Sequence, residues 1–216
     1  MVDFKHGPVA VLGMSADPAH KGHLRVAEAL HALGYERVVL MVTPQNPFKN
    51  TARTPFEHRM ALARLLAGRR TWLEISDAEA WMQVLGEELR TLHMMTHLRE
   101  IYPGTPFTFV MGSDNWQHFH TWGSYADILK TCGILVVPRP GAAALHGTEA
   151  AKVLAAQEDK AGEGVVPQGR WRVYGDLPGG PASSTQIRRV LASGQSTPWL
   201  NEKQLDYIRA NNLYTK

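Results

Sequence analysis

Short, β-branched apolar runs alternate with stretches of helical periodicity along most of this chain. Residues 9–12 form such a run and predict a buried strand, and residues 37–42 predict a second. Between them, apolar residues recur at spacings of three and four over residues 22–34, which predicts a helix that ends at a glycine cap. Strand, helix and strand in this order indicate a βαβ unit with two parallel strands.

The same alternation continues almost to the last of the 216 residues. Further strands are predicted at residues 72–75, 107–111, 134–137 and 171–174. Further helices are predicted at residues 55–67, 85–98, 149–157, 183–189 and 202–211. Strands that alternate with helices favour an α/β fold, an open parallel sheet with helices on both faces.

One stretch departs from this pattern. Residues 141–170 are rich in Ala, Gly and Gln and contain few large apolar side chains. We expect them to form a flexible surface insertion within one domain that spans residues 1–216. Residues 183–216 are expected to add a small C-terminal helical part.

The charge balance limits the classes of partner. The 23 Lys and Arg residues stand against 20 Asp and Glu residues and are scattered, without the basic stripe of a nucleic-acid binder. The single cysteine, Cys132, excludes an intramolecular disulfide and is predicted to be a small buried residue beside a strand. No stretch reaches the ~18 apolar residues that span a bilayer, and the N-terminus lacks the pattern of a signal peptide. We therefore expect a cytoplasmic protein that binds neither nucleic acid nor membrane.

The loop after the first predicted strand carries the strongest chemical signal. Ligands of open parallel sheets bind beyond the carboxyl ends of strands, where this loop lies. It places His20 and His23 at the start of a predicted helix, where unpaired N–H groups and the helix dipole favour an anion. The pattern predicts a phosphate site whose imidazoles stabilise the charge of a phosphoryl-type transition state. A metal site formed by Asp17, His20 and His23 is the alternative.

Two motifs resemble those of a known superfamily. The loop reads Gly-x-Ser-x-Asp-Pro-x-His-x-Gly-His from Gly13, and it resembles the nucleotidyltransferase signature with the core His-x-Gly-His. The later segment Ser-Ser-Thr-x-Ile-Arg, from Ser183, resembles the late motif of the same enzymes. Met14 and Ala16 depart from the pattern, which has a second Gly and a Phe there.

Five further segments resemble bacterial nicotinate-nucleotide adenylyltransferases, so that the resemblance covers nearly the whole chain except residues 141–170. These segments are residues 43–49, 112–115, 119–122, 138–141 and 207–214. The resemblance implies a Rossmann-like fold and a role in NAD biosynthesis. The implied reaction condenses ATP with nicotinate mononucleotide, giving nicotinate adenine dinucleotide and pyrophosphate.

The resemblance also implies roles for individual residues. The implied catalytic residues are His20, His23 and Arg188. The implied ATP-binding residues are Gly13, Ser15, Asp17, Gly22, Ser183, Ser184, Thr185 and Ile187. The implied mononucleotide-binding residues are Thr43, Lys49, Asp114 and Trp122. The cofactor Mg²⁺ would be held mainly by the substrate phosphates, without a metal site built from protein side chains.

Other functions stay open at this point. The acceptor of the nucleotidyl group could be another phosphate, such as nicotinamide mononucleotide, phosphopantetheine or glycerol phosphate. A catalytically idle nucleotide-binding module is a second alternative, for which the departure at Met14 is the main argument, and a nucleic-acid binder is a third. Assembly into a homo-oligomer is also open.

Overall fold

A computed structural model describes residues 7–44, 54–84, 91–139, 144–175 and 182–215 of the chain. Its centre is a six-stranded parallel sheet with the strand order β3-β2-β1-β4-β5-β6. The strands are β1 (Val9–Met14), β2 (Arg37–Val42), β3 (Leu73–Ser76), β4 (Phe107–Gly112), β5 (Gly133–Val137) and β6 (Trp171–Val173). Each predicted strand is confirmed, with bounds that move by at most two residues.

The strand order reverses between β1 and β4. From β1 the chain builds outward to β2 and β3, and it then returns to add β4, β5 and β6 on the other side of β1. Such a reversal leaves a crevice at the carboxyl ends of the two central strands, because their following loops turn to opposite sides. In this chain those loops follow Met14 and Gly112.

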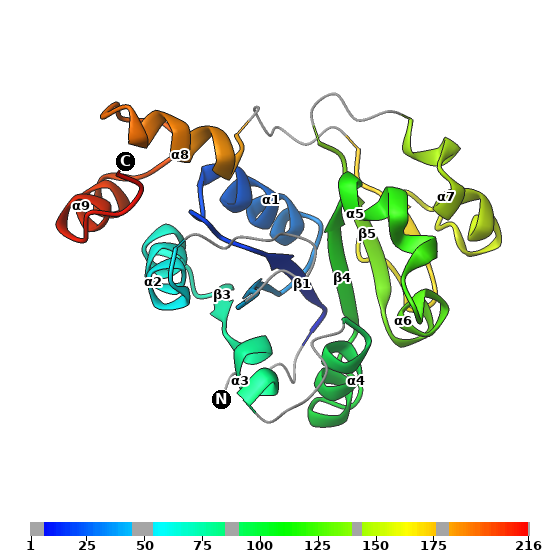
Figure 1. Ribbon diagram of the computed structural model, residues 1–216. Helices are drawn as coiled ribbons and strands as arrows, with labels where there is room; N and C mark the ends of the chain where they lie inside the picture. Colours follow the sequence, from blue (N-terminus) through cyan, green and yellow to red (C-terminus); the bar gives the residue numbers. More distant parts are fainter. Residues whose placement is uncertain (1–6, 45–53, 85–90, 140–143, 176–181, 216) are drawn as a thin grey trace.

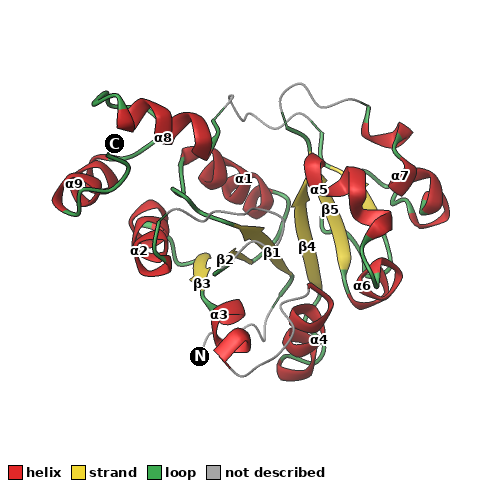
Figure 2. Ribbon diagram, viewed as in Figure 1, coloured by secondary structure: helices red, strands yellow, loops and turns green. Residues whose placement is uncertain are grey.

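Helices cover both faces of the sheet, as predicted (Figures 1 and 2). Alternate strand residues point to opposite faces, so that Ala10 and Leu12 share a core with Leu30, whereas Val9 and Val11 share one with Met95. The first face is covered by α1 (Lys21–Ala32) and α2 (Phe56–Ala67). The second is covered by α3 (Ala78–Val84), α4 (Thr91–Ile101), α5 (Ser113–His118) and α6 (Tyr125–Thr131). The fold is Rossmann-like.

The helix predicted over residues 85–98 is confirmed where the structure describes it, from Thr91 onward. In the structure α3 ends at Val84 and α4 begins at Thr91, and residues 85–90 lie outside the described ranges. The apolar stripe of α4 is real, since Met94 and Met95 are buried against the sheet. Within the described residues, the periodicity identified the buried face of α4.

The structure differs from the surface insertion predicted at residues 141–170. Residues 144–170 form η2 (Leu145–Gly147), α7 (Glu149–Val153), η3 (Ala155–Gln157) and the segment that leads to β6. Leu145, Ala150 and Leu154 are buried in the same core as α5 and α6. Large rings fill this core: the Trp171 and Trp116 ring centroids lie 4.7 Å apart in a tilted arrangement, and the Trp171 indole Nε1 donates to the Leu154 carbonyl at 2.7 Å.

The last two helices form the predicted C-terminal helical part. They are α8 (Ser184–Ala192) and α9 (Glu202–Ala210), orange and red in Figure 1, beyond α1 and α2. They pack on α2 through a separate apolar cluster of Leu62, Ile187, Leu200 and Ile208. Among the described helices, none is long and apolar enough to cross a membrane.

Candidate active site

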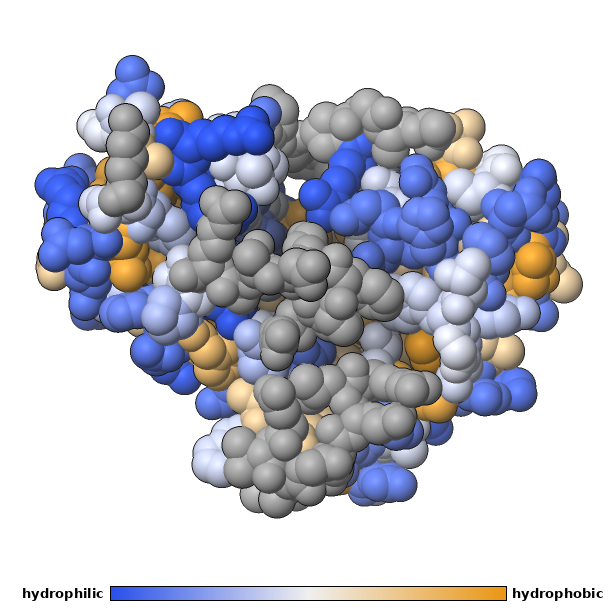
Figure 3. All heavy atoms as spheres, in the orientation of Figure 1, coloured by the Kyte–Doolittle hydropathy of each residue, from blue (hydrophilic) through white to orange (hydrophobic). Residues whose placement is uncertain are grey.

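The crevice at the strand reversal reaches the middle of the sheet at Gly13. This residue lies on β1 between β2 and β4, and it is exposed although the other residues of β1 are buried. A Cβ atom on Gly13 would lie 3.8 Å from the Phe109 ring, an ordinary contact distance. Without a side chain, Gly13 leaves the strand backbone exposed at this point. Figure 3 shows the surface hollowed between the side formed by α8 and the side formed by α5.

His20 and His23 interlock at the N-terminus of α1. His20 is the N-cap residue, and its Nδ1 accepts from the Gly22 N–H at 3.1 Å. In return the His20 N–H donates to Nδ1 of His23 at 3.2 Å, which closes a capping box made of two imidazoles. Since Nδ1 of each ring is an acceptor, the proton of each neutral imidazole is assigned to Nε2. The ring centroids lie 3.8 Å apart.

His20 is a neutral ring at physiological pH. It is only 5% exposed, and this burial, with the nearby Arg139 guanidinium as a smaller cause, lowers the pKa of His20 to about 4. A neutral imidazole with its proton on Nε2 can donate a hydrogen bond to a phosphate oxygen without giving up a proton. Gly22 makes room for this ring, because a Cβ there would lie 2.8 Å from its Cε1 atom.

The carbonyl oxygens of the β1–α1 loop are bound from outside the loop. The Ser15 carbonyl accepts from Arg59, and the Asp17 carbonyl accepts from Arg188. The next two carbonyls, of Pro18 and Ala19, accept from Ser184 and Gln204. Carbonyl oxygens repel phosphate oxygens, so a loop whose carbonyls are held by other elements suits an anion on its inner side.

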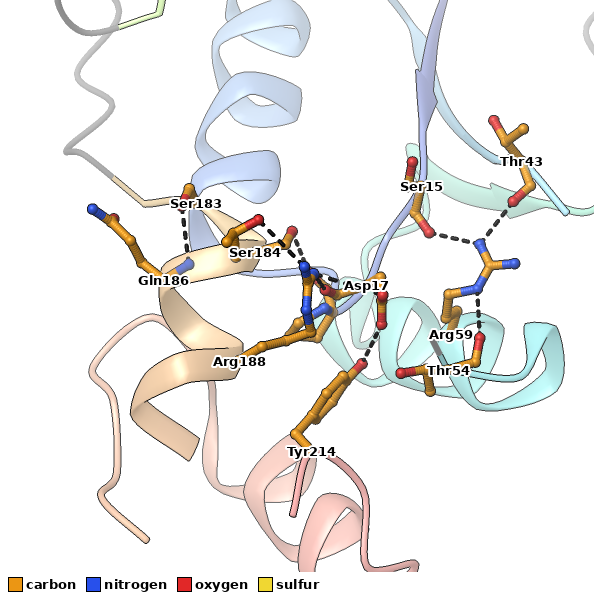
Figure 4. A network of polar contacts seen from close by, with 12 residues as sticks. Ser15, Asp17, Thr43, Thr54, Arg59, Ser183, Ser184, Gln186, Arg188 and Tyr214 are labelled. Atoms are coloured by element: carbon orange, nitrogen blue, oxygen red, sulfur yellow. Dashed lines mark hydrogen bonds and ion pairs between the residues drawn. The ribbon is translucent and has the colours of Figure 1, made fainter. Parts of the chain in front are cut away.

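The late motif therefore lies against the histidine loop. Arg188 Nη1 lies 2.5 Å from the Asp17 carbonyl and 3.6 Å from its carboxylate, and the Ser184 hydroxyl donates to the Pro18 carbonyl at 3.1 Å (Figure 4). Ala182 comes within 3.2 Å of where a Cβ on Gly22 would stand. Two motifs more than 150 residues apart in the sequence thus form one site.

The side chains of the late motif are engaged within the protein. The Ser183 hydroxyl caps α8 by accepting from the Gln186 N–H at 3.1 Å, and the Thr185 hydroxyl accepts from Arg188. Ile187, which the resemblance places among the ATP-binding residues, is only 2% exposed in the C-terminal apolar cluster. Its side chain anchors α8 in that cluster.

The two departures from the family pattern do not obstruct the crevice. Met14 is buried in the core beneath α1 and α2, so its side chain points away from the phosphate site. Ala16 is buried with a positive φ of 52°, a conformation in which a small side chain limits strain. Met14 therefore gives no reason to regard the site as catalytically idle.

Two of the residues assigned to the mononucleotide, Thr43 and Asp114, lie beside the carboxyl ends of the central strands. Thr43 follows β2, and its N–H donates to the Met14 carbonyl at 3.0 Å, so that it lies beside the end of β1. On the opposite side, Asp114 pairs with Arg139 at 3.1 Å. Trp122 is half-buried, with its ring 5.4 Å from the Phe119 ring. Lys49 lies outside the described residues.

Sequence reasoning assigned no role to several residues that shape the site: Arg59, Arg139, Gln204 and Tyr214. The Tyr214 hydroxyl donates to the Asp17 carboxylate at 3.1 Å, and burial raises the pKa of Tyr214. Their residue types carry no local signal for such contacts. Arg139 and Tyr214 each lie in a segment that resembles the adenylyltransferases, residues 138–141 and 207–214, so these two could have been found from the sequence.

Within the described ranges, no group of three or more His, Cys, Asp and Glu side chains could hold a metal ion. Asp17 cannot serve as the third ligand beside His20 and His23, because its carboxylate accepts from Tyr214 and pairs with Arg188. The alternative interpretation of this loop as a metal site is therefore not supported.

Comparisons with known proteins agree with this geometry. Residues 11–190 match the cytidylyltransferase-like family. A Caulobacter sp. (strain K31) protein named "Probable nicotinate-nucleotide adenylyltransferase" is 38% identical over 141 residues, which cover 62% of this chain and 70% of that protein. A Pelobacter propionicus protein of the same name is 31% identical over 218 aligned positions, covering 96% of this chain and 98% of the relative.

A solved structure shares the fold. The nicotinic acid mononucleotide adenylyltransferase of Plasmodium falciparum, solved in complex with NaAD, superimposes with a TM-score of 0.72 at 16% identity, over 97% of this chain and 98% of that one. At this identity the likeness concerns the fold. From the family match, the relatives and the fold together, the chain belongs to the cytidylyltransferase-like family and, within it, to the nicotinate-nucleotide adenylyltransferases.

Proposed function

We propose that the crevice joins ATP to nicotinate mononucleotide, giving nicotinate adenine dinucleotide and pyrophosphate. The observation that carries the proposal is the contact between the two motifs, in which Arg188 and Ser184 of α8 bind the Asp17 and Pro18 carbonyls of the histidine loop. This contact sets two helix N-termini, those of α1 and α8, beside one crevice. The helix dipole makes each N-terminus favourable for an anion, so the pair suits a triphosphate.

The chemistry needs no covalent enzyme intermediate. A phosphate oxygen of the mononucleotide attacks the α-phosphorus of ATP in line, the bond to the β-phosphate breaks, and pyrophosphate leaves. The protein's task is orientation and stabilisation of the charge on the transferring group. His20 and His23 would donate from Nε2 to non-bridging oxygens, and the first-turn N–H groups of α8 would hold the leaving pyrophosphate.

The contacts of Arg188 indicate a different role from the one that the resemblance implies. The resemblance makes it catalytic, but in the structure its guanidinium holds the Asp17 carbonyl and carboxylate. We propose that Arg188 acts on the phosphates mainly by fixing this loop. Arg139 is more accessible to the phosphates than Arg188, because its side chain is 60% exposed. It also lies close enough to His20 for its charge to lower the pKa of that ring.

The acceptor would lie between the carboxyl ends of β1, β2 and β4. Thr43 and Asp114 flank that space, and the half-buried Trp122 supplies an aromatic surface on the α5 side. Lys49 keeps its expected role toward the mononucleotide phosphate as part of this proposal.

Mg²⁺ fits this site as an ion carried by the substrate. The nearby carboxylates are engaged, Asp17 with Arg188 and Tyr214 and Asp114 with Arg139, while phosphate oxygens are the ligands that Mg²⁺ prefers. When bound, the ion would neutralise charge on the triphosphate.

The test offers Mg²⁺ and ATP with nicotinate mononucleotide, nicotinamide mononucleotide or phosphopantetheine in parallel. We expect the fastest pyrophosphate release with nicotinate mononucleotide, together with the dinucleotide product identified by mass spectrometry. Faster turnover of another acceptor would instead assign to the protein the transfer of the adenylyl group to that acceptor. ATP binding without pyrophosphate release from any acceptor would leave an idle nucleotide-binding module.

A further inference from the structure

Arg59 is a buried cation for which the proposed reaction has so far needed no role. It lies on α2 and is only 1% exposed. Burial lowers the pKa of Arg59, with the nearby Asp17 and Tyr214 acting in the opposite direction. Burying a guanidinium costs free energy unless its N–H groups find acceptors. The acceptors of Arg59 therefore indicate its role.

The partners of Arg59 are backbone carbonyls of two different loops. Nη1 donates to the Ser15 carbonyl at 2.7 Å, in the loop after β1, and to the Thr43 carbonyl at 2.7 Å, after β2. Nη2 donates to the Pro44 carbonyl at 2.6 Å, and Nε to the Thr54 carbonyl at 3.1 Å. Figure 4 shows the planar guanidinium between Ser15 and Thr43, with Thr54 beside it.

These two loops serve the two substrates of the proposed reaction. The loop after β1 carries the histidines that would hold the ATP phosphates, and Thr43 opens the loop that would hold the mononucleotide. An in-line attack requires the two reacting phosphates to be aligned, and an error of about 1 Å costs on the order of 100-fold in rate. The distance between the loops therefore bears directly on turnover.

We propose that Arg59 is a positioning residue that fixes the loop after β1 relative to the loop after β2, and thereby aligns the two substrates. The inference rests on the proposed function and adds to it a residue that touches neither substrate. The guanidinium suits this task because its N–H groups diverge in one rigid plane, which a lysine ammonium on a flexible stem does not reproduce.

The chain supplies a matched control in Arg172 on β6. It is also a buried arginine that donates to loop carbonyls, those of Glu163 and Gly164, and it pairs with Asp159. Its loop belongs to the edge of the sheet, three strands away from β1. Substitution there removes the same kind of buried contact without touching either substrate loop.

The experiment measures kcat, the KM for each substrate and the Tm of Arg59→Lys, Arg59→Gln and Arg172→Lys. For both Arg59 variants we expect kcat to fall about 100-fold while each KM changes only a few fold, because each substrate still meets its own loop. Arg172→Lys should lower the Tm and leave kcat unchanged. Arg59→Gln buries no charge, so it keeps the test valid should the lysine variant fail to fold.

Wild-type kcat in a folded Arg59 variant would overturn the inference, as would an equal loss of kcat in Arg172→Lys. A wild-type protein that makes no dinucleotide is a different result, since it would reject the proposed function and this inference with it.

Discussion

The His20 side chain is both an N-cap and a member of the candidate phosphate site. As a cap it must accept a hydrogen bond from the Gly22 N–H, which requires an unprotonated Nδ1. As a phosphate donor it must keep a proton on Nε2. One neutral tautomer meets both demands, and the burial that lowers the pKa of His20 to about 4 secures it.

His20 should therefore make stability depend on pH. The pKa is about 4 in the folded protein and 6.5 in the unfolded chain, so that between these values the unfolded chain binds a proton that the folded protein does not. The contribution is fully present above pH 6.5 and is lost as the pH falls toward 4, by about 3 kcal/mol. Asn is a good N-cap that does not titrate, so the stability advantage of wild type over His20→Asn should shrink across this window in urea titrations. A constant difference would show that His20 titrates normally.

His23 should matter for turnover. Its Nδ1 is engaged by the His20 N–H, so that Nε2 is the donor it can offer to a phosphate. We expect His23→Ala to lower kcat on the order of 10²–10³-fold, as the loss of one preorganised donor does. His31→Ala is the matched control on the same helix, because His31 lies in the last turn of α1, stacked on Trp72. Unchanged turnover in a folded His23→Ala variant would remove this residue from the mechanism.

At the scale of elements, the β1–α1 loop is built by helices far away in sequence. Its carbonyls are held from α2, α8 and α9, and the Lys21 N–H at the start of α1 donates to the Trp199 carbonyl at 2.9 Å. Asp17 lies at the centre, with Arg188 and Tyr214 on its two carboxylate oxygens. The C-terminal helical part thus helps to fix the conformation of the phosphate loop, together with α2.

Tyr214→Phe tests this support. It removes one hydrogen bond to a buried carboxylate, which should lower the free energy of unfolding by about 1.5–3 kcal/mol and raise the KM for ATP. Tyr207→Phe is the control, because the hydroxyl of Tyr207, also in the C-terminal part, hydrogen-bonds with Nδ1 of His58 at 2.9 Å and not with the phosphate loop. Its KM for ATP should stay at the wild-type value. Equal kinetics in the two variants would mean that Asp17 does not transmit the contact to the phosphate loop.

At the scale of the whole molecule, the strands were predictable because buried parallel strands are continuous apolar runs. The strand order was not predictable, because the sequence does not show on which side of the sheet each crossover connection adds the next strand. The histidine loop was predictable because its chemistry lies within eleven consecutive residues, 13–23. The contacts of Arg59, Gln204 and Tyr214 join residues 44 to 197 positions apart, and no local pattern encodes them.

The helical part of residues 144–170 was predicted at residues 149–157, but the packing of this segment in the core was not. Alanines contribute little to a hydrophobic pattern in the sequence, yet Ala150 and Ala151 are buried here in the same core as Trp171. Leu154→Ala should therefore lower the free energy of unfolding by about 2–5 kcal/mol, as at other core sites. The neighbouring Val153 is 53% exposed, so Val153→Ala should stay within about 0.5 kcal/mol of wild type. Equal, small effects in denaturant titrations would restore the interpretation of this segment as a surface insertion.

The most direct measurement is a crystal structure of the protein with a non-hydrolysable ATP analogue. We expect a triphosphate in the crevice above Gly13, within hydrogen-bond distance of Nε2 of His20 and His23 and of the first-turn N–H groups of α8. A triphosphate bound elsewhere, with both imidazoles out of its reach, would contradict it.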